Sequence, residues 1–167
     1  MFKEVNFNST YRKNSFPSLA IGTSGAIYDV YADQQKGNGA EIEFCATAGT
    51  AACSPVIINN ASTGQQFMPS VTVDSQGYIH ASWFDTRNSS ATSQYDIYAT
   101  YSGNGGASFA PNARVTSGLV NAGSASFIGD YAGIAAAPVS SVRYAHPVWT
   151  SGGFNNGQLQ TAALTAP

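Results

Sequence analysis

Charged residues are scarce in this sequence: Lys, Arg, Asp and Glu make up only 10% of the chain, whereas about 25% is usual in soluble domains. Seven basic and nine acidic side chains leave a net charge of −2, so the chain lacks the basic surface that nucleic acids require. Apolar runs of about 20 residues are also missing, and a helix needs that length to span a bilayer. We therefore expect neither a nucleic-acid partner nor a membrane span.

Polarity comes instead from Ser, Thr, Asn, Gln and Gly, while aromatic residues make up 12% of the chain. Aromatic and β-branched residues favour strands, and no segment shows the apolar period of an amphipathic helix. The 167 residues are enough for one domain with a hydrophobic core. We predict a single all-β domain covering residues 1–167.

An internal repeat organises this domain. Residues 16–33, FPSLAIGTSGAIYDVYAD, align without gaps with residues 68–85, MPSVTVDSQGYIHASWFD, at an offset of 52. A third copy follows, and the pattern Tyr-x-His-x-x-Trp of residues 78–83 recurs at residues 144–149. Each copy predicts two strands joined by a tight turn, and a polar loop then leads to a third strand. Because Trp83 and Trp149 hold matched positions, we expect both to belong to the core.

Units of about 50 residues with four short antiparallel strands are typical of β-propeller blades. We predict one blade at residues 15–60, a second at 66–118 and the first three strands of a third at 126–167. Residues 1–10 have the spacing of a fourth strand without a blade of its own. The chain would then supply three four-stranded blades, begun one strand late.

Three blades do not close a ring, because propellers typically use four to eight. Two chains could assemble head to tail into six blades, each N-terminal strand completing the last blade of its partner. We favour this homodimer. The chain could instead be part of a longer propeller, or form an open prism of three sheets.

The loop YSGNGGASF, residues 101–109, resembles the Asp box of bacterial neuraminidase repeats (BNR), Ser-x-Asp-x-Gly-x-Thr-Trp. The matching residues here are Ser102, Asn104, Gly106, Ser108 and Phe109. A short Asx side chain can fold such a turn by bonding to its own backbone, and Gly can take positive φ. Together with the repeats, the loop makes the chain similar to sialidase-like propellers. In that family the box is structural, so the resemblance is specific for the fold and weak for activity.

The equivalent hairpin of the first copy reads CATAGTAACS and has lost the box. Cys45 and Cys53 flank it, where they could lie opposite each other and form a disulfide. The alternative is two small buried cysteines. A disulfide would favour an oxidising compartment, and no signal peptide is recognisable in this chain. We expect a secreted or periplasmic protein whose export signal is absent from the sequence.

Propeller geometry predicts one face that carries the loops around the central channel, where ligands usually bind. Several of the few charges collect there, and we predict a ligand-binding set with an aromatic neighbour: Arg12, Asp33, Asp85, Arg87, Asp130 and Tyr131. Phe154, Asn155 and Asn156 could add sugar contacts. The alternative is that these residues only solvate loop ends, as charges do in any soluble protein.

The resemblance raises the question of sialidase activity. Those enzymes hold a carboxylate with three arginines and use a Tyr nucleophile. The arginine of the family's Phe-Arg-Ile-Pro motif is absent here, because Asn14-Ser15-Phe16-Pro17 and the matching Gln66-Phe67-Met68-Pro69 replace it. None of the three glutamates lies beside a convincing tyrosine. His80 and His146 recur with the repeat, which favours a structural role.

Two functions remain open. We favour a non-catalytic module that binds a glycan or another surface ligand at the channel face. The alternative is a glycoside hydrolase of sialidase type whose site assembles in the closed ring, with Asp85, Asp130 and Tyr131 as its catalytic candidates. We expect no cofactor and no zinc site, and a Ca²⁺ at Asp85 or Asp130 is the one metal to consider.

Overall fold

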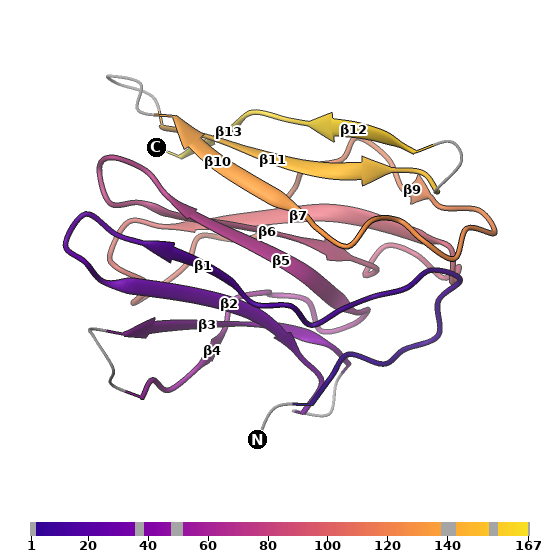
Figure 1. Ribbon diagram of the computed structural model, residues 1–167, viewed down its shortest axis with the longest axis horizontal. Helices are drawn as coiled ribbons and strands as arrows, with labels where there is room; N and C mark the ends of the chain where they lie inside the picture. The colour runs from indigo at the N-terminus through magenta and orange to yellow at the C-terminus, as the bar shows by residue number, and fades with distance from the viewer. Residues whose placement is uncertain (1–2, 36–38, 48–51, 138–142, 154–156, 167) are drawn as a thin grey trace.

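The computed structural model describes residues 3–35, 39–47, 52–137, 143–153 and 157–166 of the chain. These residues form three antiparallel sheets that lie side by side in chain order (Figure 1). They include no helix, and so none that could cross a membrane. The all-β prediction is confirmed.

The first sheet has the order β1-β2-β3-β4. Its tight turn places Ile21 opposite Ile27, and its next pair runs from Ile27 opposite Thr47 to Asp33 opposite Glu41. The strands are β1 (Ser18–Ile21), β2 (Ile27–Asp33), β3 (Glu41–Thr47) and β4 (Val56–Ile57).

The second sheet repeats this order as β5-β6-β7-β8, and β9 adds to β7 beyond β8. Residues 67–70 hold a register shift between β5 and β6, where Met68 takes a φ of 49°. The strands are β5 (Gln66–Val73), β6 (Ile79–Asp85), β7 (Gln94–Ser102), β8 (Ala113–Arg114) and β9 (Val120–Asn121).

The third sheet has the order β10-β11-β12, and β13 also pairs with β11. The predicted third strand is therefore broken into two pieces that share one partner. The strands are β10 (Gly133–Ala137), β11 (Arg143–Ser151), β12 (Gln158–Thr161) and β13 (Leu164–Ala166).

The core lies between the sheets. Side chains alternate along each strand, so the buried Tyr28, Val30 and Ala32 of β2 face the second sheet. On the other side, the tilted rings of Phe84 and Tyr95 in the second sheet pack with centroids 4.9 Å apart, and Tyr95 Oη donates to the carbonyl of Thr150 at 2.6 Å. Trp83 and Trp149 are both buried, as the repeat predicts.

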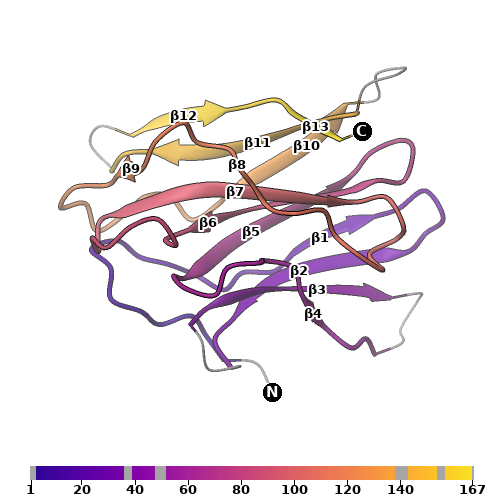
Figure 2. The same cartoon turned by 180° about the vertical axis from the view of Figure 1, so that it is seen from behind.

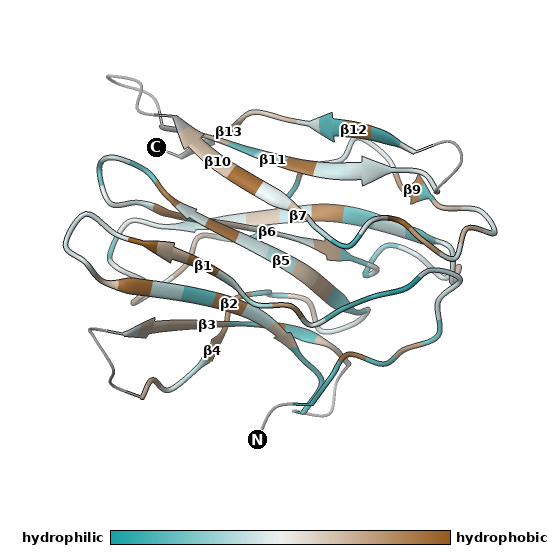
Figure 3. Cartoon of the chain, viewed as in Figure 1, coloured by the Kyte–Doolittle hydropathy of each residue, from teal (hydrophilic) through white to brown (hydrophobic). Residues whose placement is uncertain are grey.

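The two outermost faces of this stack are exposed. The outer face of the first sheet carries Leu19 and Ile21 beside Asp29, and the outer face of the third sheet carries Val148 and Leu159. Figure 3 shows the corresponding hydrophobic segments on β1 and β12. Each face therefore presents apolar surface without a covering sheet.

The N-terminal segment differs from its prediction as a strand. Its described residues, 3–17, contain no strand and instead pass along one end of all three sheets (Figures 1 and 2). Gln34 N–H donates to the Lys3 carbonyl at 3.1 Å, Thr10 N–H to Thr92 at 3.0 Å, and Arg12 N–H to Ser126 at 2.9 Å. The backbone groups that a strand ladder would use are taken by these loops.

Candidate functional site

One group of predicted residues does come together. Arg12 Nη2 donates to Asp130 Oδ1 in an ion pair, and Asn14 Nδ2 lies 3.3 Å from the same oxygen. Tyr131 follows directly and exposes 82% of its surface. We call Arg12, Asn14, Asp130 and Tyr131 the Asp130 cluster. It combines an anion, an amide, a guanidinium and an open aromatic ring.

The Asp130 cluster is built by two segments far apart in sequence. The N-terminal segment delivers Arg12, whose backbone N–H is fixed to the carbonyl of Ser126. Its guanidinium carbon lies 5.1 Å from the centroid of the Phe127 ring, within range of a cation–π contact. The loop before β10 delivers Asp130. Both halves are therefore held in place before any ligand arrives.

Asp85 and Arg87 were predicted to face a ligand, but the structure places Asp85 in the interior. The Asp85 carboxylate is fully buried and accepts from Arg87 Nη2 at 2.7 Å and Arg87 Nε at 2.9 Å. Trp83 Nε1, the Arg87 backbone N–H and Gln66 Nε2 also donate to it, at 3.0, 2.8 and 3.3 Å. A carboxylate with all its partners inside the protein is not available as an acid, a nucleophile or a calcium ligand.

A second buried carboxylate escaped the sequence analysis. Asp96 lies opposite Asp85 across the β6–β7 pair and is also fully buried. Arg114 Nη2 and Thr116 Oγ1 each donate to Asp96 Oδ1 at 2.7 Å, and Asn88 Nδ2 donates to Oδ2 at 2.8 Å. Two carboxylates side by side in a sheet would repel each other, and the two arginines offset that repulsion.

These ion pairs also show which partner each described arginine has. Each of the three arginines whose side chains the structure describes pairs with a different aspartate: Arg12 with Asp130, Arg87 with Asp85 and Arg114 with Asp96. Within that part of the chain, each guanidinium group thus forms its own ion pair. They do not converge as an arginine triad on one substrate carboxylate.

Asp33, the first-repeat counterpart of Asp85, is likewise structural rather than ligand-facing. It is buried, and its Oδ1 accepts the backbone N–H groups of Gln35 at 2.9 Å and Lys3 at 3.0 Å. The bond to the residue two positions on repeats the Asp85–Arg87 turn. Asp33 therefore fastens the N-terminal segment to the end of β2.

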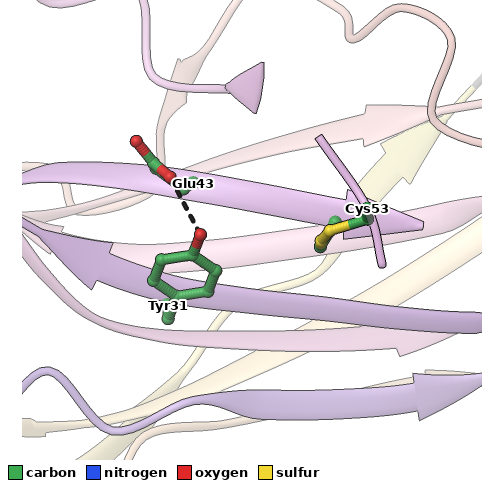
Figure 4. The surroundings of a disulfide bond; sticks show 4 residues. Tyr31, Glu43 and Cys53 are labelled. Carbon is green, nitrogen blue, oxygen red and sulfur yellow. Dashed lines mark hydrogen bonds between the residues drawn. A yellow bond between two sulfur atoms is a disulfide. The ribbon is translucent and has the colours of Figure 1, made fainter. Parts of the chain in front are cut away.

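The structure reveals a tyrosine–glutamate pair that was not anticipated. Tyr31 Oη donates to Glu43 Oε2 at 2.9 Å across β2 and β3 (Figure 4). Burial first, and the hydrogen bond to Glu43 second, raise the pKa of the Tyr31 phenol well above its usual range. The phenol stays protonated, whereas a nucleophile would need the opposite shift.

The loop that resembles an Asp box is closed by its asparagine. Ser108 N–H donates to Asn104 Oδ1 at 3.0 Å, and Asn104 Nδ2 donates to Ser108 Oγ at 2.8 Å. Gly106 has a φ of 90° and touches the Phe44 ring so closely that a Cβ would clash. Phe109 packs edge-on against Phe44 with centroids 4.9 Å apart. The loop thereby ties the second sheet to the first.

Cys45 and Cys53 form a disulfide in the equivalent hairpin of the first sheet, with Cα atoms 5.9 Å apart (Figure 4). Of the remaining candidates, Phe154–Asn156 lie outside the described residues. No group of three or more His, Cys, Asp or Glu side chains suitable for a metal occurs among the residues described.

Comparison with known proteins finds a similar fold but no similar sequence. No family model matches the sequence, and no curated protein matches it either. Among solved structures, the chain is similar to the Hadza microbial sialidase Hz136, with a TM-score of 0.56 over 94% of this chain at 11% identity. It spans 36% of that protein's length. The fold is therefore sialidase-like, over about a third of such an enzyme.

Proposed function

We propose that this chain is a non-catalytic, sialidase-like β-propeller module that binds glycans through the Asp130 cluster. The observation that carries the proposal is the exposed side chain of Tyr131, which directly follows an Asp130 that Arg12 and Asn14 hold in place. An aromatic ring stacks on the apolar face of a pyranose. Carboxylate, amide and guanidinium groups bond its hydroxyls.

The arrangement of carboxylates favours binding over catalysis. Most retaining and inverting glycosidases need two carboxyl groups free to approach one glycosidic bond, and a sialidase, with its Tyr nucleophile, still needs an available acid/base carboxylate. Here Asp85 and Asp96 are buried and fully bonded, and Asp130 is paired with Arg12. Hydrolysis of a sialoside remains the alternative function, with Asp130 and Tyr131 as its residues.

A glycan array followed by titration tests the proposal. We expect saturable binding that Tyr131→Ala weakens about tenfold, since the stacking of a nucleobase on an aromatic ring is worth about 1–3 kcal/mol and a pyranose has a face of similar size. Tyr131→Phe keeps the ring and should retain most of the affinity. Turnover of a fluorogenic sialoside that is lost in Asp130→Asn would overturn the non-catalytic assignment.

We further propose that copies associate head to tail through the two outer faces. Ile79, Ala81 and Trp83, the counterparts of Ile27, Asp29 and Tyr31, are buried in the second sheet. His80 and Ser82, which match His146 and Val148 of the third sheet, are buried as well. The two outer faces thus match the two sides of the contact that neighbouring sheets make within the chain. The chain forms this contact twice, once between the first and second sheets and once between the second and third. Two chains would bring six blades together, enough to close a ring.

Light scattering tests this association. We expect a mass near twice 17.4 kDa, and we expect Leu19→Glu or Leu159→Glu to return the protein to the monomer. Val56→Glu places the same charge on an exposed apolar residue away from both faces. A monomeric wild type, or dissociation caused only by Val56→Glu, would contradict the proposed association. Export to an oxidising compartment, which the disulfide favours, is part of the same proposal.

A further inference from the structure

The ion pair between Arg12 and Asp130 leaves polar groups of both side chains without a protein partner. Asp130 accepts hydrogen bonds from Arg12 Nη2 and Asn14 Nδ2, and both bonds end on Oδ1. Among the described residues, nothing donates to Asp130 Oδ2 and nothing accepts from Nε or Nη1 of Arg12. The Arg12 side chain is 56% exposed and that of Asp130 27%, and Asp130 Oδ2 is not a buried atom. A ligand can therefore reach both a hydrogen-bond acceptor and a donor on this pair.

Adjacent hydroxyl groups of a sugar ring match this acceptor and donor. Each hydroxyl donates one hydrogen bond and can accept others. One hydroxyl can donate to Asp130 Oδ2 while the oxygen of its neighbour accepts from Arg12, and a charge on the protein strengthens both bonds. The Phe127 ring and the Ser126 carbonyl already hold Arg12, so little further ordering is needed on binding. The pair therefore favours a vicinal diol, which pyranose rings carry, over an isolated hydroxyl.

The charges of this pair also limit what can bind. The guanidinium of Arg12 and the carboxylate of Asp130 cancel each other. Lys13, the next basic residue along the chain, donates from Nζ to the Phe7 carbonyl and lies 5.0 Å from the centroid of the Phe7 ring, so its ammonium group is held elsewhere in the N-terminal segment. A carboxylate on a ligand would have to bind beside Asp130 or displace it from Arg12. Two carboxylates close together repel each other, which disfavours an acidic ligand.

We propose that the Asp130 cluster selects a neutral pyranose through two adjacent hydroxyl groups and discriminates against acidic sugars, sialic and uronic acids included. The inference rests on the proposed function of glycan binding and adds the class of glycan. The Arg12–Asp130 pair is the specificity determinant, because the same carboxylate that accepts from a hydroxyl also neutralises the arginine that could hold an acid.

Calorimetric titration with matched glycosides tests the proposal. The probes are the methyl glycosides of glucose and galactose and those of glucuronic and galacturonic acid, in which a carboxylate replaces the exocyclic CH₂OH group. We expect saturable binding of a neutral glycoside and about tenfold weaker binding of its uronide. A neutral ligand has no charge for salt to screen, so its affinity should be the same in low and high salt.

Asp130→Asn tests the role of the ion pair directly. It keeps an oxygen that can accept from Arg12 but removes the negative charge, so the guanidinium becomes available to a ligand carboxylate. We expect the uronide to gain about tenfold in affinity relative to the neutral glycoside, and its binding to weaken with added salt. Ser75→Lys makes the same change in net charge in the exposed turn between β5 and β6, at the opposite end of the sheets from residues 3–17 (Figure 1), and should leave the preference unchanged. Thermal unfolding of each variant checks that it is folded.

The outcomes separate this inference from the proposed function on which it rests. Failure of every glycoside up to about 10 mM, together with an array on which no glycan binds, overturns both. Tighter binding of a uronide or a sialylated glycan than of its neutral counterpart overturns the selectivity alone, and so does a preference that Asp130→Asn leaves unaltered. Tyr131→Ala should weaken neutral and acidic glycosides by similar factors. A loss confined to one class would assign the selectivity to Tyr131 and refute the role of the ion pair.

Discussion

The guanidinium of Arg87 lies 3.9 Å from the centroid of the Tyr98 ring while it donates two hydrogen bonds to Asp85. One arginine thus covers an aromatic ring and neutralises a carboxylate that no solvent reaches. A charged residue at a strand end invites a functional interpretation. Here it holds β6 to the loop that follows it.

We expect Asp85→Ala to lower the free energy of unfolding by about 3 kcal/mol, because it leaves the largely buried Arg87 guanidinium and the buried Trp83 indole N–H without their carboxylate. Asp130→Ala breaks the more exposed Arg12 pair and should cost no more than about 1 kcal/mol. Denaturant unfolding of the two variants measures the difference. Equal costs would show that the Asp85 pair is not the interior contact described here.

Asn104→Ala should destabilise the second sheet by about 1–2 kcal/mol, because Ser108 N–H and Ser102 Oγ both lose the acceptor that they share. Asn104→Asp restores the residue usual in an Asp box, keeps that acceptor and lets Ser108 Oγ donate to it, so its stability should match or exceed that of the wild type. Thermal unfolding compares the pair. Equal losses in both would mean that the side-chain oxygen does not close the turn.

Reduction of the Cys45–Cys53 disulfide should lower the free energy of unfolding by about 2–3 kcal/mol, as expected from the entropy of opening a short loop. Unfolding is compared with and without a phosphine reductant. The double variant Cys45→Ala/Cys53→Ala is the control, and it should not respond to the reductant. A wild type that is equally indifferent would contradict the prediction.

Asp29 should make stability fall as the pH rises. Burial, only partly offset by the backbone N–H of Val30, raises the pKa of the Asp29 carboxyl in the folded chain above its ordinary value. The folded state therefore favours the protonated acid. Its stabilising contribution is complete below the unfolded value of about 3.9 and is lost as the pH passes the higher folded value.

Asp29→Asn removes this dependence. We expect the variant and the wild type to be about equally stable near pH 3, and the variant to be the more stable of the two near pH 7. Chemical unfolding at a series of pH values measures the gap. A difference that does not change with pH would show that Asp29 is solvated like an ordinary surface acid.

Most of what could be predicted about the fold came from the internal repeat. The offset of 52 places Ile27 on Ile79, and both begin the second strand of their sheets. Matched positions also identified Trp83 and Trp149 as core residues, which they are. Such inferences succeed because strand pairing and burial depend on a local period that the sequence repeats.

The parts that failed depend on side-chain contacts that the repeat pattern does not encode, some local and some between separate strands. Val5 has the spacing of a fourth strand, yet its N–H is taken by Ser15 Oγ at 2.8 Å. Asp85 has the position of a ligand-facing residue, yet Arg87 and Trp83 enclose it. Asp96 and Arg114 lie on separate strands, and nothing in their spacing marks them as partners. Only the register of β6, β7 and β8 brings these charges together.

The path of residues 3–17 also limits when the molecule can finish assembling. Thr10 and Arg12 bond to Gly123, Ser126 and Asp130, more than a hundred positions further along the polypeptide. During synthesis, these early residues must wait until the chain beyond position 130 has left the ribosome. Their docking is therefore a late event with a high loop-closure cost, and the Asp130 cluster exists only after it.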